Sequence, residues 1–239
     1  MKIFSADQIY QADKSTIQKE QIKSEELMER AAAQLFEWLH SRLRGTQVSI
    51  QLFCGIGNNG GDGMALARML NEHDYSIKVH VVNYSDKRSE DFLLNLERLK
   101  DLKVWPDFIN KESDLPEISP NDIVVDAIFG IGLNRVPDDW VGKLIGHIND
   151  SRAFVLSVDV PSGLPVDRAP WNTSYVIQAS YVLSFQLPKL VFFLPETGVY
   201  LNQWEVLDIG LNQDFITNTE ADFELIGRPE VLPMYRPRL

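Results

Sequence analysis

The chain has 239 residues, of which 44% are hydrophobic and 24% are charged, as in an ordinary soluble protein built around one large α/β domain. The formal net charge of −11 argues against a nucleic-acid partner, because an acidic surface repels phosphates. A lone cysteine, Cys54, excludes an internal disulfide and favours a reducing compartment. Neither a signal peptide nor an apolar stretch of membrane-spanning length is evident, so we expect a cytoplasmic protein that makes no membrane contact.

The first 45 residues are predicted to be helical. Apolar residues recur there at every fourth position, which marks one buried helix face. They are Leu27, Ala31, Leu35, Leu39 and Leu43. We expect Ser24 to cap the start of this helix and Gly45 to end it.

Beyond residue 45 the predicted strands and helices alternate. We expect strands over residues 48–54, 77–82, 123–128, 154–160, 181–185 and 204–209, and helices around 64–70, 92–99 and 140–148. This alternation predicts an α/β fold in which a mostly parallel central sheet is covered on both faces. We assign residues 1–227 to this domain and residues 228–239, which are rich in proline, to a tail or linker.

The glycine-rich loop of residues 55–63 joins the first predicted strand of this domain to a helix. Its glycines permit close backbone approach to a ligand, and a helix N-terminus offers free N–H groups to an anion. The loop matches neither common nucleotide motif, because Asn58 and Asn59 interrupt the dinucleotide fingerprint and no Gly-Lys-Ser/Thr is present. A tight turn that binds no ligand is the alternative interpretation.

Two further loops follow predicted strands. Asp126 interrupts an apolar strand and therefore needs hydrogen bonds or a cation, while Asp159 and Ser162 follow the strand over residues 154–160. Parallel strands end at one edge, so Asn59, Asp126 and Ser162 are predicted to lie along the same edge. These oxygen ligands, with one carboxylate among them, favour a weakly bound monovalent cation.

The three loops, in this order, resemble the YjeF N-terminal family, the NAD(P)HX epimerases. The matching stretches are Asn58-Asn59-Gly60-Gly61-Asp62-Gly63, Asp126-Ala127-Ile128-Phe129-Gly130 and Asp159-Val160-Pro161-Ser162-Gly163-Leu164. Residues 27–31, 183–185 and 206–211 and Lys189 add to the resemblance, which covers roughly residues 1–212.

The resemblance implies a Rossmann-like three-layer α/β/α sandwich and an isomerase that interconverts the R and S forms of hydrated NADH and NADPH (NADHX and NADPHX) at C6 of the nicotinamide ring. It also implies one K⁺ per subunit, held by Asn59, Asp126 and Ser162. The implied substrate contacts are Asn58, Asn59, Gly60, Gly61, Asp62, Gly130, Ile131, Gly132, Leu133, Asn134, Arg135, Val136 and Asp159. Relatives often carry a small polar residue at the position of Ile131, so a hydrogen bond made there is not expected here.

The family resemblance also suggests partners. Relatives suggest a homodimer, and many continue into a dehydratase domain that consumes one epimer. The proline-rich end resembles the linker to such a domain, so a fused or separate NAD(P)HX dehydratase is an expected partner.

Epimerisation needs a group that gives and takes a proton. Asp159 is the first candidate and Asp62 the second, since Asp126 is better suited to hold the cation. Two alternatives remain open at this point. One is a conventional Rossmann enzyme, such as an oxidoreductase or methyltransferase, although Asn83 stands where an acidic residue would hold a ribose. The other is a nucleotide-binding or protein-interaction domain without epimerase activity.

Overall fold

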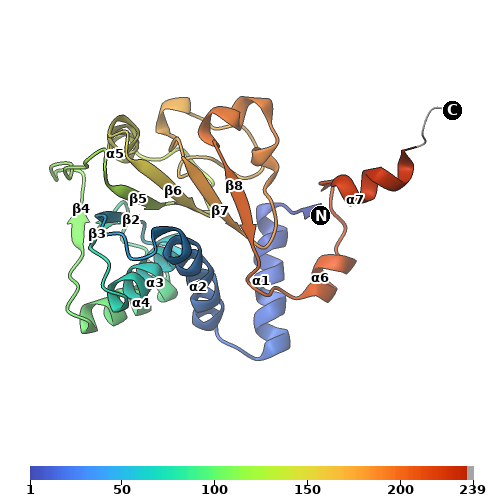
Figure 1. Cartoon of the computed structure of the whole chain (residues 1–239), viewed down its shortest axis with the longest axis horizontal. Coiled ribbons are helices and arrows are strands. Elements are labelled where there is room, and N and C mark those ends of the chain that lie inside the picture. Colours follow the sequence, from blue (N-terminus) through green and yellow to red (C-terminus); the bar gives the residue numbers. More distant parts are fainter. Residues whose placement is uncertain (236–239) are drawn as a thin grey trace.

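The computed structural model describes residues 1–235, apart from the side chains of residues 229, 230 and 234. A seven-stranded sheet with the strand order β4-β3-β2-β5-β6-β7-β8 forms the centre of this described part (Figure 1). Its strands are β2 (Ile50–Cys54), β3 (Ile77–Val82), β4 (Asp107–Ile109), β5 (Ile123–Ala127), β6 (Phe154–Val158), β7 (Tyr181–Phe185) and β8 (Trp204–Leu207). Each neighbouring pair is parallel, which confirms the predicted parallel α/β sheet.

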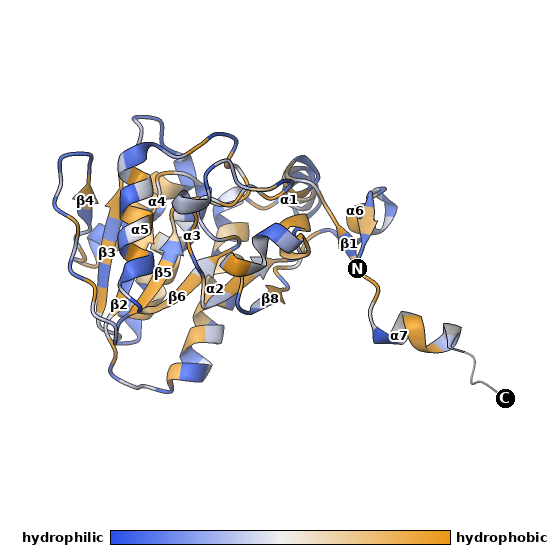
Figure 2. Ribbon diagram, turned by 90° about the horizontal axis from the view of Figure 1, so that it is seen from above, coloured by the Kyte–Doolittle hydropathy of each residue, from blue (hydrophilic) through white to orange (hydrophobic). Residues whose placement is uncertain are grey.

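Helices cover both faces of the sheet. One face carries α2 (Ser24–Leu43), α3 (Asn58–Glu72) and α4 (Glu90–Asp101), and the other carries α5 (Asp139–Asp150) together with the 3₁₀ segments η1 (Thr173–Tyr175), η2 (Leu190–Phe192) and η3 (Pro195–Tyr200). Neighbouring strand residues point to opposite faces, so Leu52 packs in the first core and Phe53 in the second. Figure 2 shows the mostly hydrophobic strands between helices and loops that carry the hydrophilic surface. This is the expected three-layer α/β/α arrangement.

A smaller unit packs against the end of the sheet. It consists of α1 (Ala6–Glu20), α6 (Gln213–Asn218) and the two-stranded antiparallel pair of β1 (Lys2–Ile3) with β9 (Phe223–Glu224). Ile9 and Ala12 of α1 join a third apolar cluster with Leu187, Ile209 and Leu211, which come from the far end of the chain. This packing fixes α1 beside the carboxyl ends of β7 and β8.

The predicted helical region before residue 45 is two helices, because Gln21 adopts a left-handed conformation between α1 and α2. The predicted Ser24 cap is wrong. Lys23 is the N-cap residue, and its backbone N–H donates to the Glu26 carboxylate. Ser24 is already helical, and its hydroxyl donates to Asp91 of α4 at 2.9 Å. The helix ends at Leu43, with Arg44 in the left-handed C-cap position directly before Gly45, which also has a positive φ.

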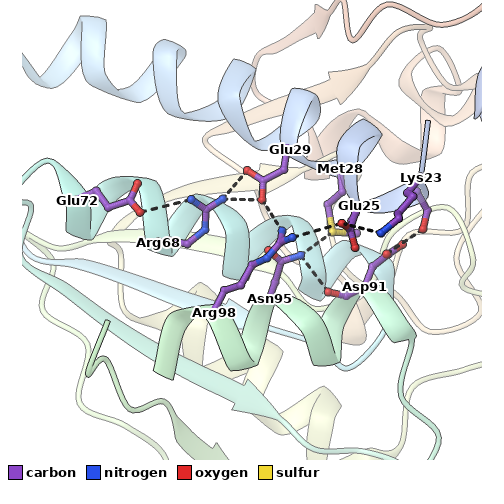
Figure 3. A network of polar contacts seen from close by, with 10 residues as sticks. Lys23, Glu25, Met28, Glu29, Arg68, Glu72, Asp91, Asn95 and Arg98 are labelled. Carbon is purple, nitrogen blue, oxygen red and sulfur yellow. Dashed lines mark hydrogen bonds and ion pairs between the residues drawn. The ribbon is translucent and has the colours of Figure 1, made fainter. Parts of the chain in front are cut away.

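A polar network joins α2, α3 and α4 (Figure 3). The Glu29 carboxylate of α2 accepts hydrogen bonds from Arg68 of α3 and from Arg98 of α4. The Arg68 side chain is only 17% exposed, so its charge is largely shielded from water and depends on Glu29. The network therefore fixes the position of α3 relative to α2 and α4, and the first turn of α3 forms part of the candidate site.

The C-terminal segment after residue 227 forms the short helix α7 (Arg228–Val231) and the 3₁₀ turn η4 (Leu232–Met234), which stand away from the sheet (Figures 1 and 2). The proposed tail is thus partly helical, and residues 236–239 lie outside the described residues. Within residues 1–235 we find no helix that combines the length and the hydropathy needed to cross a membrane.

Candidate functional site

A cavity of about 770 Å³ opens along the carboxyl ends of the central strands, where parallel α/β sheets bind ligands. The loops after β2, β3, β5, β6 and β7 all contribute to its wall, and α1 closes one side. The predicted site residues that line it are Asn58, Asn59, Asp62, Gly130, Ile131, Gly132, Leu133, Asn134, Arg135 and Asp159. The structure therefore brings the three predicted loops together.

The remaining predicted substrate contacts lie elsewhere. Gly60 and Gly61 are buried in the first turn of α3, where a Cβ on Gly60 would stand 1.8 Å from the carbonyl oxygen of Gly55. Gly60 allows α3 to pack closely against the end of β2, and Gly61 allows it to pack closely against Met28 of α2. Val136 is 42% exposed and lines a separate hollow beside α5.

The N-terminus of α3 opens onto the cavity. Gly57 precedes the helix in an extended conformation, and none of the described side chains caps this end. The first N–H groups of the helix, on Asn58, Asn59 and Gly60, therefore have no partner within the helix. Together with the helix dipole, they form a local anion-binding site in an otherwise acidic protein.

Asp126 lies fully buried at the end of β5. Its carboxylate accepts hydrogen bonds from the Ser157 hydroxyl at 2.8 Å, from the Ser162 backbone N–H at 2.8 Å and from the Ser162 hydroxyl. Burial raises the pKa of Asp126, and the hydrogen bonds from Ser162 and Ser157 oppose that shift. The carboxylate thus ties the loop after β6 to the end of β5.

Asn59 and Ser162 approach the same segment after β5. The Ser162 hydroxyl accepts from the Phe129 N–H at 2.9 Å, and a Cβ on Gly130 would lie 3.1 Å from Asn59 Oδ1. The buried Asn59 Nδ2 has no hydrogen-bond partner among the described residues. The two ends of an amide are assigned from their surroundings, and the reversed orientation places an oxygen at this position. An amide oxygen, a hydroxyl and a carboxylate then form a donor set that fits an alkali cation.

Asp159 and Lys189 form a buried ion pair beside the cavity. The Lys189 ammonium lies 2.9 Å from Asp159 Oδ1 and donates to the carbonyl oxygens of Phe185 and Leu187, each at 3.0 Å. The same carboxylate oxygen accepts from the Phe185 N–H at 3.2 Å. Asp159 adopts a left-handed backbone conformation with φ of 65°, which turns the chain sharply after β6.

Tyr10 and Asp13 are among the cavity residues that were not predicted. Both come from α1. Burial, together with the nearby Asp159, raises the pKa of Asp13 to about 7, although Lys189 opposes the shift. Burial also raises the pKa of Asp62 well above its ordinary value, and the negative charges of Asp159 and Asp13 raise it further. The cavity therefore holds carboxyl groups whose pKa values lie above their ordinary range.

The only sequence signal for Asp13 is its place on α1. It is adjacent to the buried helix face formed by Ile9, Ala12 and Thr16. That pattern indicates that Asp13 lies near an interface, but it does not show which part of the chain covers it.

A parallel α/β sheet with a polar cavity at its strand ends defines a ligand-binding protein of the Rossmann-like class. A family model described as "YjeF-related protein N-terminus" matches residues 24–191. The chain belongs to this family, which confirms the resemblance inferred from the three loops.

Similar curated proteins carry names that refer to the epimerisation or repair of NAD(P)H hydrate. An NAD(P)H-hydrate epimerase of Oenococcus oeni is 34% identical, over 87% of this chain and 96% of that protein. One of Anaerococcus prevotii is also 34% identical, over 80% of this chain and 86% of its own length. A bifunctional NAD(P)H-hydrate repair enzyme of Thermofilum pendens is 35% identical over 80% of this chain, which spans 36% of that enzyme's length.

The crystal structure of the yeast protein ynu0 has the same fold. Its TM-score is 0.74, the two sequences are 23% identical, and the match covers 96% of this chain and 98% of the yeast chain.

Proposed function

We propose that this protein is an NAD(P)H-hydrate epimerase that interconverts the R and S forms of NADHX and NADPHX. The observation that carries this proposal is one cavity in which the uncapped N-terminus of α3 meets the carboxyl groups of Asp13, Asp62 and Asp159. The helix end suits the substrate diphosphate. The carboxyl groups suit proton transfer at the hydrated ring. The names of similar proteins from Oenococcus oeni and Anaerococcus prevotii support the same activity.

The reaction must break and remake the C6–O bond of the reduced ring. In one route the ring nitrogen donates its electron pair, a protein acid protonates the hydroxyl and water leaves. Water then adds to the other face of C6 and returns a proton to a protein base. In a second route the ring opens to an aldehyde and closes again. Both routes conserve atoms and charge, and both need an acid and a base in the site.

The surroundings of the carboxyl groups suggest how these roles divide. The Asp159 carboxylate lines the cavity and lies 2.9 Å from the Lys189 ammonium, a position in which it can accept a proton and face a positively charged ring. The raised pKa values of Asp62 and Asp13 suit them to donate a proton. We therefore assign Asp159 as the base and Asp62 as the acid, with Asp13 as a neighbouring proton store.

We further propose that Asn59, Asp126 and Ser162 hold one K⁺ per subunit. The buried Asn59 amide without a partner among the described residues and the hard-oxygen donor set support this site. When bound, the ion adds positive charge beside the diphosphate site and ties together the loops after β2, β5 and β6. Thermal unfolding tests the site without an activity assay: the melting temperature should be higher in KCl than in choline chloride, and Ser162→Ala should abolish the difference. An equal melting temperature in both salts contradicts the proposal.

Partners and location follow from the same proposal. We expect a homodimer in the cytoplasm that supplies one epimer to a dehydratase. The name of the bifunctional Thermofilum pendens relative, which is much longer than this chain, supports a link to a second repair activity. Light scattering coupled to gel filtration measures the oligomeric state, and a monomeric mass contradicts the homodimer.

The decisive experiment is an epimerisation assay. Purified R-NADHX is incubated with the protein, with K⁺ present or absent, and the isomers are separated by chromatography. The S form should appear much faster than in the spontaneous reaction. Asp150→Asn, which changes an exposed carboxylate at the end of α5, should retain the full rate and serves as the matched control for Asp159→Asn. A folded protein that gives only the spontaneous rate with both NADHX and NADPHX contradicts the proposed function.

A further inference from the structure

The cavity wall carries charges of both signs. Its acidic residues include Asp13 of α1, Asp62 of α3 and Asp159 after β6. The loop that follows β3, residues 83–89, contributes two adjacent cations, Lys87 and Arg88. In a chain with a net charge of −11, two adjacent cations facing a cavity form a local exception that favours an anionic ligand group.

The loop holds Arg88 in a fixed position. The Arg88 guanidinium donates to Asn83 Oδ1 at 2.7 Å and to the Asp86 carbonyl oxygen at 3.1 Å. The loop itself is anchored, because the Ser89 N–H donates to the carbonyl oxygen of Ile56 at 3.0 Å, beside the glycine-rich loop. A guanidinium has five N–H groups, so Arg88 retains donors for a ligand beyond these two bonds.

The acidic residues that flank the two cations in sequence include Asp86 and Asp91. Asp86 is exposed and does not contribute to the cavity wall. Asp91, at the start of α4, does line the wall, and its carboxylate accepts a hydrogen bond from the Ser24 hydroxyl of α2. Lys14 of α1 and Arg135 of the loop after β5 also line the cavity and add positive charge.

The position of Arg88 in the fold indicates which anion it meets. In dinucleotide-binding α/β sheets the diphosphate lies at the first helix N-terminus and the adenosine ribose lies at the end of the next strand. An acidic side chain there binds the ribose 2′-hydroxyl, whereas an arginine accommodates a 2′-phosphate. Here β3 runs into Asn83, which is uncharged and holds Arg88.

We infer that Lys87 and Arg88 form a subsite for the 2′-phosphate of the adenosine ribose, so that the protein prefers NADPHX to NADHX. This inference rests on the proposed epimerase function for its kinetic test. The subsite itself is a binding property and is also measurable without turnover.

The kinetic test compares kcat/KM for NADPHX and NADHX in the wild type, in Arg88→Gln and in the double variant Lys87→Gln/Arg88→Gln. The wild type should favour NADPHX, and Arg88→Gln should lower kcat/KM for NADPHX by roughly tenfold to a hundredfold, mainly through KM, because a charge-assisted phosphate contact is lost. The value for NADHX should change less than about threefold. Lys111→Gln removes an exposed charge on the neighbouring loop outside the cavity and should leave both values unchanged.

The binding test uses adenosine 2′,5′-bisphosphate and 5′-AMP in titration calorimetry. The wild type should bind the bisphosphate more tightly, and Arg88→Gln should remove the difference. Equal affinity of the wild type for both probes overturns the subsite. An equal loss of kcat/KM for both substrates in Arg88→Gln overturns it as well, since it places Arg88 on the shared diphosphate. Failure to epimerise either substrate, with selective bisphosphate binding intact, instead rejects the proposed function and supports the subsite.

Discussion

The Lys189 ammonium lies 2.9 Å from Asp159 Oδ1, and the Lys189 side chain has no exposure to solvent. Its other two hydrogen bonds go to the carbonyl oxygens of Phe185 and Leu187, so all three N–H groups have acceptors. Asp159 in turn is tied to β7 through its backbone N–H, which donates to the Leu183 carbonyl oxygen at 2.7 Å. Each charge of this pair therefore depends on the other to remain buried.

Lys189→Met should destabilise the protein by about 3–5 kcal/mol, because it leaves the Asp159 carboxylate buried without its partner. Urea denaturation measures the loss. The double variant Asp159→Asn/Lys189→Met should recover part of this stability, since it leaves no unpaired charge. If the two substitutions prove additive, the ion pair contributes no coupling energy and this account of the buried pair fails.

Asp159→Asn should lower the epimerisation rate by roughly 10²–10⁴-fold, the usual contribution of a positioned general base. Asparagine is the appropriate replacement because it tolerates the left-handed backbone at this position, where alanine would add strain. Chromatography of the R and S isomers gives the rate, and circular dichroism checks the fold. Turnover near that of the Asp150→Asn control would remove Asp159 from the mechanism.

Much of the sheet could be predicted from the sequence. The strands β3 and β7 lie at the predicted bounds, because each is a short and mostly apolar segment with clear breaks on both sides. The meeting of Asn59, Asp126 and Ser162 near one edge follows from parallel topology alone, which places the ends of all strands together. The three-residue strand β4 (Asp107–Ile109) was missed because two of its residues are exposed and show no buried pattern.

The part of the site contributed by α1 could not be predicted. Asp13 and Tyr10 reach the cavity because α1 packs on Leu187, Ile209 and Leu211, which lie more than half the chain away in sequence. Helix periodicity identifies a buried face and leaves its partner undefined. Burial of Lys189 has the same origin, because only the folded loop after β7 supplies the carbonyl oxygens that surround its ammonium.

Gly60→Ala should disrupt the first turn of α3. The new Cβ would stand 1.8 Å from the Gly55 carbonyl oxygen, so the backbone must move, at a cost of about 1–3 kcal/mol or more. Gly146→Ala is the matched control, because a Cβ there meets open space on α5 and should stabilise the protein by about 1 kcal/mol. Thermal unfolding of both variants gives the comparison. A Gly60→Ala protein as stable as the wild type would mean that α3 does not pack this closely on the end of β2.

Asp13→Asn should change how stability depends on pH. The pKa of Asp13 is raised from 3.8 to about 7, so between these values the folded protein holds a proton that the unfolded chain has released. The wild type therefore loses stability from this group as pH rises toward 7, and the loss is complete above it. An asparagine does not titrate, so the stability of the variant relative to the wild type should increase as the pH is raised from 5.5 to 8.

Urea denaturation at these two pH values measures the effect of Asp13→Asn, with Asp150→Asn as a control whose exposed carboxylate should add no such slope. The same substitution should flatten the pH–rate profile near pH 7 if Asp13 exchanges protons with Asp62, since both carboxyl groups line one cavity. A stability difference between Asp13→Asn and the wild type that stays constant across this range would show that Asp13 is ionised throughout. In that case Asp13 would act as a fixed negative charge opposite the Lys189 ammonium, and the proton donated during epimerisation would have to come from Asp62 alone.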